Sequence, residues 1–189
     1  MDSNNLLSGL AGAVIALIVT EFWKFVAKEN DLVEEREIFK NYLEISMHDV
    51  FLKYALDIDK ASNRIANYPS FDMINDSDIY DANPILNSSV FKEIGFNRLF
   101  LLLRTPKLHN DAIDLYNVIE YLIADRPLTI LQSFIIKYDD VIKDRNATNA
   151  EVVSTKLSNL KYSFQENLKH KKVAINQAIE INKRLIDSL

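Results

Sequence analysis

The fold is decided by residues 148–189, TNAEVVSTKLSNLKYSFQENLKHKKVAINQAIEINKRLIDSL, which contain neither glycine nor proline. The stretch opens with a capping box, because the Thr148 hydroxyl and the Glu151 carboxylate can each satisfy a free backbone N–H of a helix start. Apolar residues follow at near-heptad spacing, which predicts a helix roughly 60 Å long with one buried stripe. These residues are Val153, Leu157, Leu160, Phe164, Leu168, Ile175, Ala178, Leu185 and Leu189.

A second long helix is predicted from Leu32 to Ala66, ending before Tyr68-Pro69 because proline disfavours helical backbone in the residue before it. Its apolar residues are separated by three or four positions. They are Phe39, Leu43, Met47, Val50, Tyr54, Ile58, Ala61 and Ile65. Two long helices of similar length predict an all-α fold, an elongated bundle with coiled-coil-like long helices.

Shorter helices are predicted between the two long ones. The first runs from Ser88 to Arg104, with a bend at Gly95. The second begins at Thr105-Pro106, an N-cap followed by proline at the first helical position, and a third begins after Asp125-Arg126-Pro127. Only three glycines and four prolines occur in the chain, which favours long helices over many turns.

Residues 67–87 are predicted to form an acidic loop. They contain four aspartates without any lysine or arginine: Asp72, Asp76, Asp78 and Asp81. An EF-hand counted from Asp76 would need Gly and Glu where Asp81 and Asn87 stand, so the calcium-binding pattern fails. We therefore expect a solvated loop and no metal site.

The start of the chain is typical of a membrane anchor. Residues 3–20, SNNLLSGLAGAVIALIVT, carry no charge, and Glu21-Phe22-Trp23-Lys24 follows them. Aromatic and lysine side chains suit the membrane–water interface, and the apolar stretch from Leu6 to Val26 is long enough to cross a bilayer. We expect residues 1–28 to form a single transmembrane helix and residues 29–189 to form one helical domain.

Basic residues near this span lie only on its C-terminal side, at Lys24, Lys28, Arg36 and Lys40. The positive-inside rule therefore predicts that the N-terminus is outside and that the helical domain is cytoplasmic. Acidic residues dilute the local charge, so the inverted topology stays open as an alternative.

Small residues recur at every fourth position of the predicted span, at Ser8, Gly12, Ala16 and Thr20. Such a face allows two membrane helices to approach closely, which makes it a candidate homodimer interface. Small residues are also common in membrane spans generally, so the dimer remains a hypothesis.

Composition and motifs exclude several kinds of activity. The net charge of −5 argues against a nucleic-acid partner, and the absence of cysteine excludes thiol catalysis and cysteine-ligated metals. No phosphate-binding glycine loop, zinc-protease motif or serine-hydrolase motif occurs in the sequence. We expect no cofactor.

One short motif names candidate catalytic residues. Residues 104–109, RTPKLH, have R-x4-H spacing and resemble the R-x4-6-H motif of HEPN ribonucleases. The resemblance implies RNA cleavage by an all-helical domain, with Arg104 and His109 as its catalytic residues. Thr105 and Pro106 depart from the family pattern, in which Asn often follows the arginine. The other interpretation is a helix-terminal arginine and a first-turn histidine that both face water.

A basic cluster, Lys169-His170-Lys171-Lys172, lies in the middle of the last long helix. Four consecutive residues point in four directions around a helix, so we expect a solvated surface with one side chain packed across the apolar stripe.

The sequence predicts a single-pass, membrane-anchored helical protein that acts through protein contacts on the cytoplasmic face, as a scaffold or adaptor. Its expected partners are the lipid bilayer and either another protein or a second copy. A non-enzymatic role is favoured. The alternatives are a HEPN-like ribonuclease and, if the topology is inverted, an extracytoplasmic sensor or scaffold.

Overall fold

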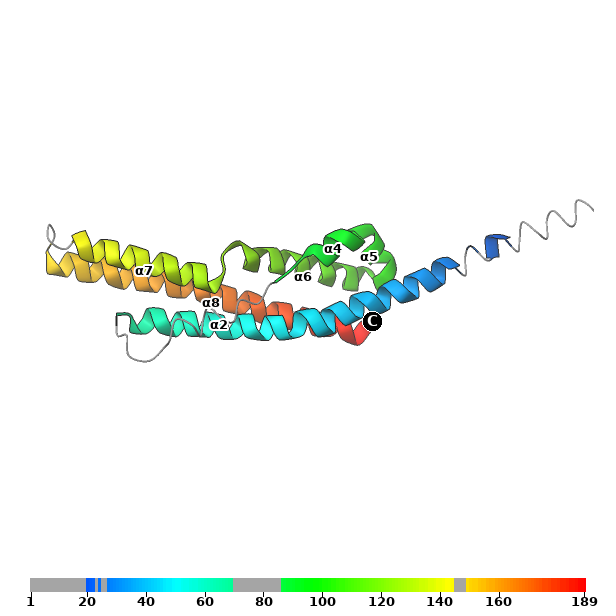
Figure 1. Cartoon of the computed structure of the whole chain (residues 1–189), viewed down its shortest axis with the longest axis horizontal. Coiled ribbons are helices and arrows are strands. Elements are labelled where there is room, and N and C mark those ends of the chain that lie inside the picture. Colours follow the sequence, from blue (N-terminus) through cyan, green and yellow to red (C-terminus); the bar gives the residue numbers. More distant parts are fainter. Residues whose placement is uncertain (1–19, 23, 25–26, 70–85, 145–148) are drawn as a thin grey trace, which may run out of the picture.

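Two long helices run antiparallel along the computed structural model (Figure 1). The structure describes residues 20–22, 24, 27–69, 86–144 and 149–189. The first long helix comprises residues 27–41, a π-helical segment η1 (Tyr42–Met47) and α2 (His48–Asn67). The second is α8 (Ala150–Ser188). Across the described residues every regular element is helical, so the predicted all-α bundle is confirmed.

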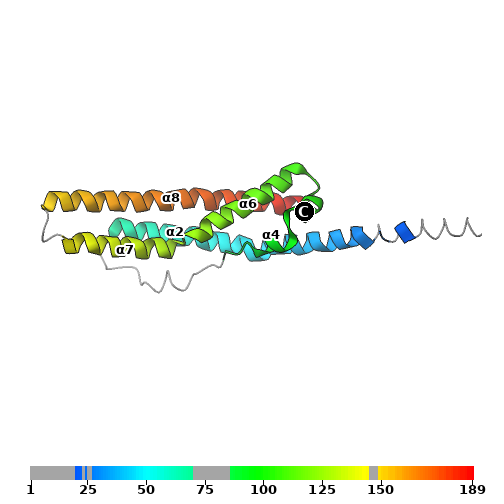
Figure 2. The ribbon, with the colours of Figure 1, turned by 90° about the horizontal axis from the view of Figure 1, so that it is seen from above.

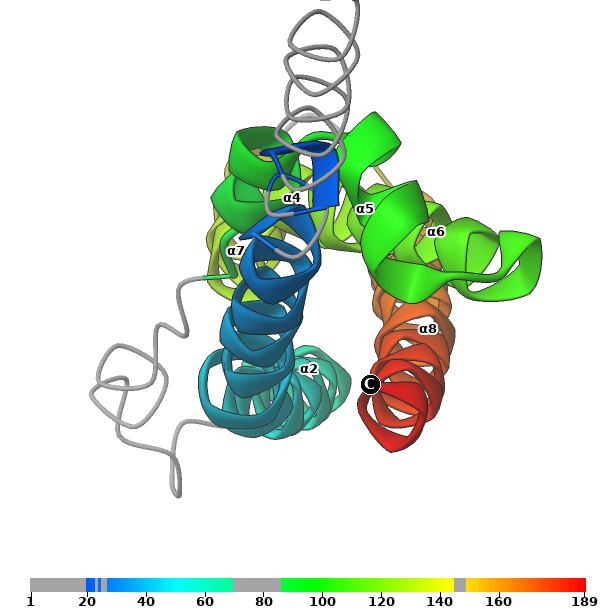
Figure 3. The same ribbon diagram turned by 90° about the vertical axis from the view of Figure 1, so that its right-hand side faces the viewer.

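Four shorter helices complete the bundle: α4 (Ser89–Ile94), α5 (Phe96–Leu103), α6 (Pro106–Ala124) and α7 (Pro127–Lys143). Helices α6 and α7 follow one another along α8 (Figure 2). The half of the bundle that contains the end of α2 is therefore built from α2, α7 and α8. The other half is built from η1, α6 and α8, with α4 and α5 beside them (Figure 3).

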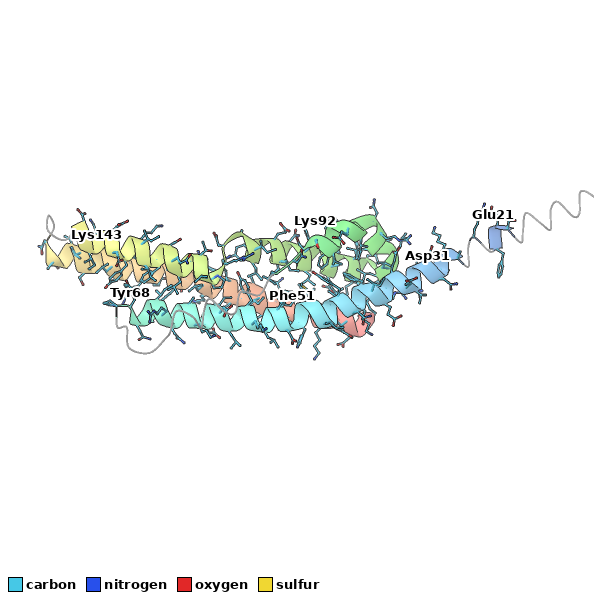
Figure 4. All side chains as sticks on the ribbon, viewed as in Figure 1. Glu21, Asp31, Phe51, Tyr68, Lys92 and Lys143 are labelled. Carbon is cyan, nitrogen blue, oxygen red and sulfur yellow. The ribbon has the colours of Figure 1, made fainter. Side chains whose placement is uncertain are left out.

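One hydrophobic core extends through both halves. The predicted stripe of the first long helix is buried as expected, with only Val50 half-exposed. Near one end, Tyr68 and Phe134 rings meet edge to face at 5.6 Å, and towards the other end Phe39 meets Phe91 in the same way at 5.7 Å. Figure 4 marks Tyr68 and Lys143 at the first of these ends and Asp31 beyond the other.

The π-helical segment was not predicted, although the sequence contains its cause. Phe39, Leu43, Met47 and Phe51 are all buried at successive four-residue steps. An α-helical turn of 3.6 residues would rotate such a series away from the core, whereas the wider π turn keeps it there. The Asn182 side-chain amide of α8 donates a hydrogen bond to the Leu43 carbonyl at 3.1 Å within this segment.

The predicted breaks between the short helices are confirmed, and one is sharper than expected. Gly95 adopts φ 78°, a conformation that glycine tolerates best, and it separates α4 from α5 completely. Thr105 caps α6 by accepting a hydrogen bond from the Leu108 N–H at 3.3 Å, with Pro106 at the first position. Pro127 begins α7 as predicted.

The predicted capping of α8 needs correction. Its N-cap is Asn149, whose Oδ1 accepts a hydrogen bond from the Glu151 N–H at 3.1 Å, and not Thr148. Asparagine is at least as effective as threonine at an N-cap, so a helix start at Asn149 is favourable. Thr148 itself lies outside the described residues.

The predicted anchor and the acidic loop fall largely outside the described part of the chain. Residues 1–19 and 70–85 are not described, so these predictions remain predictions. Within the described ranges, none of the helices has both the length and the apolar character needed to cross a bilayer.

Candidate functional site

The junction between α5 and α6 holds both residues of the predicted catalytic pair. Arg104 ends α5 in a left-handed conformation, φ 58°, which is uncommon for a residue with a side chain. The junction is fixed to the first long helix because Arg36 donates from Nε and Nη2 to the Leu102 carbonyl, at 3.0 and 2.8 Å. Arg98 of α5 also binds Glu35, with an Nε–Oε2 distance of 2.6 Å, and this hydrogen bond lowers the pKa of Glu35.

His109 is held between the two helices of the junction. Its Nε2 lies 3.0 Å from the Phe96 carbonyl oxygen, and its ring meets Phe100 edge to face at 5.3 Å. Because a carbonyl only accepts hydrogen bonds, Nε2 carries the proton and is engaged within the fold. Among the described contacts, none joins Arg104 to His109, so the catalytic pair stays a prediction.

Arg104 instead has another cation near it. Arg36 is half-buried, and its pKa is lowered by that burial and by the charge of Arg104, with a partial offset from Glu29. Arg104 is exposed, and in the described part of the chain it has neither a hydrogen-bond partner nor an ion-pair partner. The R-x4-H motif did not indicate that Arg36 and Arg104 lie near each other, because Arg36 belongs to a different helix.

A second polar group lies where α6 ends and α7 begins. The last carbonyls of a helix lack partners within it, and they carry the negative end of the helix dipole. Here the Tyr54 hydroxyl donates to the Leu122 carbonyl at 2.6 Å. The Lys171 ammonium donates to the Tyr121 carbonyl at 3.1 Å and lies 4.4 Å from the centre of the Tyr121 ring. Both long helices therefore satisfy the end of α6.

Lys171 is the member of the basic cluster that packs across the stripe, as the sequence predicted. Its side chain is 1% exposed, and this burial lowers its pKa, although the charge of Asp125 partly opposes the shift. Lys169 faces water, while Lys172 forms an ion pair with Asp59 of α2 at 2.6 Å. The cluster thus contributes to packing between α8 and its neighbours.

Asp57 of α2 is a buried acid close to Tyr54, which belongs to the polar group at the end of α6. Its Oδ1 has no hydrogen-bond partner among the described residues. Burial raises the pKa of Asp57 to about 6, with a partial offset from Lys60 and Lys53. Asp57 lies three residues after Tyr54 on the same helix. Burial is the main cause of the raised pKa of Tyr54, and the charge of Asp57 adds to it.

The other predicted sites lie mostly outside the described residues. Within the described ranges, no group of three or more histidine, aspartate or glutamate side chains is arranged to hold a metal ion. Of the candidate dimer face, Ser8, Gly12 and Ala16 lie outside the described residues, and Thr20 is helical and exposed. The aspartates of the acidic loop also lie outside them.

The architecture defines an elongated all-α bundle with a buried polar group at its middle. No family model, no curated protein and no solved structure matches the chain.

Two lysines of the basic cluster provide a direct test of how α8 packs. We expect Lys171→Ala to lower the free energy of unfolding by about 2 kcal/mol, because the Tyr121 carbonyl near the end of α6 loses a charged hydrogen-bond donor. Lys169→Ala should change it by less than about 0.5 kcal/mol, since its side chain faces water. Urea unfolding followed by circular dichroism measures both. Equal effects of the two substitutions would show that Lys171 is not buried.

Proposed function

We propose that this chain is a single-pass membrane protein whose residues 29–189 work in the cytoplasm through protein contacts, as a scaffold or adaptor. The observation that carries the proposal is the uncharged run Ser3 to Thr20, followed by an aromatic and lysine flank. The basic residues Lys24, Lys28, Arg36 and Lys40 on the C-terminal side support the cytoplasmic placement of the bundle.

Exposed apolar side chains on the first long helix support a role in binding. Ile38, Ile45, Leu52 and Leu56 are all exposed, Ile45 to 73%. Leu52 and Leu56 are four residues apart in α2 and share one side of it, away from the core stripe, whereas Ile38 and Ile45 lie before and within the π-helical segment, whose wider turn rotates them relative to that pair. Large apolar side chains exposed to water favour contact with another protein or a second copy. A dimer through Ser8, Gly12, Ala16 and Thr20 would bring the first long helices of two copies close together.

Membrane fractionation tests the proposal. We expect the full-length protein to sediment with membranes and to resist extraction at alkaline pH, because a spanning helix is not removed by breaking surface contacts. Deletion of residues 1–28 should release a soluble protein with a helical circular dichroism spectrum, since the hydrophobic core begins after this segment. Full-length protein in the soluble fraction would contradict the anchor.

A reporter fused after Leu189 serves as the topology control in the same preparations. Cytoplasmic activity of the reporter is expected from the position of the basic residues. A signal from the opposite side would reverse the orientation and favour the extracytoplasmic sensor or scaffold.

A further inference from the structure

The outward side of α5 combines apolar and basic side chains. Leu99, Leu102 and Leu103 point into the core, while Phe100 and Leu101 are 45% and 46% exposed. Asn97 and Arg104 are also exposed. Asn97, Phe100 and Leu101 follow the spacing i, i+3 and i+4 and share one side of the helix, and Arg104 is the left-handed residue that ends it. Lys107, in the first turn of α6, is exposed immediately beyond them.

The positive charge on this side is not compensated within the described part of the protein. Arg104 and Lys107 have neither hydrogen-bond nor ion-pair partners there. Two carboxylates from this end of the bundle are already engaged, since Glu35 pairs with Arg98 and Asp111 pairs with Arg184 at 2.9 Å. The chain as a whole carries a net charge of −5, so this surface differs in charge from the protein average. A locally basic surface attracts an anionic partner.

The position of this surface in the bundle indicates which partner. Helix α5 lies at the end of the bundle from which the amino-terminal helix departs (Figures 1 and 3). Contacts of Arg36 with Leu102 and of Glu35 with Arg98 hold α5 against that helix. Arg36 is about 12 Å along the helix from Lys28, where the predicted anchor ends. A helix tilt towards the upper end of the usual range of about 0–40°, in the direction of α5, would lower α5 to the headgroups.

We propose that Phe100, Leu101, Arg104 and Lys107 form a docking surface for an anionic lipid bilayer. Arg104 and Lys107 pair with lipid phosphates, and Phe100 and Leu101 enter the interfacial layer, where aromatic and aliphatic side chains are favoured. The proposal rests on the proposed membrane anchor, which keeps the bilayer near α5. Docking would fix the tilt of the bundle relative to the bilayer.

The cysteine-free chain allows one label to be placed at a chosen position. Asn97→Cys puts an environment-sensitive fluorophore on the docking side without altering the four proposed lipid contacts, and Asn159→Cys on α8 puts it at the opposite end of the bundle. Each full-length protein is reconstituted into vesicles of phosphatidylcholine alone or of phosphatidylcholine with phosphatidylglycerol. Quenching by lipids with a spin label in the headgroup region reports contact with the bilayer, and flotation reports the anchor.

We expect quenching at position 97 in the vesicles that contain phosphatidylglycerol, weaker quenching in phosphatidylcholine alone, and none at position 159. Removing charge with Arg104→Gln and Lys107→Gln should lower the ratio of lipid-bound to free label about 5-fold for each residue, and high salt should do the same. Arg104→Lys together with Lys107→Arg should retain the quenching, because both keep the charge. Flotation should not change in any of these variants.

Several outcomes overturn the inference. Flotation without quenching at position 97 would leave the anchor intact and exclude docking. If quenching at position 97 is unchanged by Arg104→Gln and Lys107→Gln, α5 approaches the bilayer without help from these two cations. Failure of the wild-type protein to float with either kind of vesicle would contradict both proposals. If the wild-type protein floats only with anionic vesicles, and Arg104→Gln and Lys107→Gln abolish that flotation, the result would support docking and contradict the anchor. If single-stranded RNA, and not lipid, changes the fluorescence at position 97, the phosphates recognised are those of RNA.

Discussion

Phe134→Ala is expected to lower the free energy of unfolding by about 3–5 kcal/mol, the largest effect we predict for this protein. Phe134 of α7 is fully buried, and its ring meets Tyr68, Tyr138 and Phe164 at 5.6, 5.7 and 5.6 Å. These rings come from the end of α2, from α7 and from α8. Truncation therefore removes apolar contacts with all three helices and leaves a cavity that they cannot easily close.

Ile136→Ala is the matched control because Ile136 belongs to the same helix and is 62% exposed. It should change stability by less than about 0.5 kcal/mol. Chemical unfolding followed by circular dichroism measures both variants. If Phe134→Ala were no more destabilising than Ile136→Ala, α7 would not pack in the orientation described.

Asp57→Asn is expected to stabilise the protein by up to about 3 kcal/mol near pH 7.5. The ordinary pKa of 3.8 is raised to about 6 in the folded state because the carboxyl group is buried. A raised pKa means that folding favours the protonated acid, so the carboxyl group costs nothing below about pH 4. Between about pH 4 and pH 6 its cost grows by about 1.4 kcal/mol per pH unit, and above that range the cost is constant. Asparagine stays neutral and avoids this cost.

The free-energy difference between Asp57→Asn and the wild-type protein should therefore shrink as pH falls from about 7.5 to 4. Asp59→Asn is the control, because Asp59 is exposed and pairs with Lys172, so its removal should not stabilise the protein. Denaturant unfolding across this pH range measures the difference. A difference independent of pH would mean that the carboxylate of Asp57 is well solvated or paired in the folded state.

The order and approximate bounds of the helices could be predicted because apolar spacing, prolines and caps are local properties of the chain. The π-helical segment could not, because Phe39, Leu43, Met47 and Phe51 call for a wider turn only if all four must reach the same core. For a different reason, the sequence did not identify Lys171 as the buried member of the basic cluster, or Asn182 as a buried residue. They occupy seam positions of the same heptad spacing as Leu168, Ile175, Ala178 and Leu185, and a search restricted to apolar residues passes over them.

The candidate site shows the same division between local and tertiary information. Arg104 and His109 could be selected from their spacing in the sequence, and Thr105 could be recognised as a cap. The proximity of Arg36 to Arg104 depends on the packing of α5 against the first long helix, which no local pattern reveals. The exposed pair Phe100 and Leu101 could likewise not be separated from the buried leucines beside it, because nearly every residue in this part of α5 is apolar.

The buried polar residues of α8 determine how far this helix can slide along its neighbours. Apolar seam residues tolerate a shift of one heptad, about 10 Å, because similar side chains replace one another. Lys171 and Asn182 do not, since each has its hydrogen-bond acceptor at one place only, the carbonyls of Tyr121 and Leu43. These two residues lie three turns apart on α8 and contact different helices, so a shift would leave both polar groups buried without partners. The long bundle therefore has a single axial register. Because α8 cannot slide along its neighbours, the distance between the two ends of the bundle is fixed.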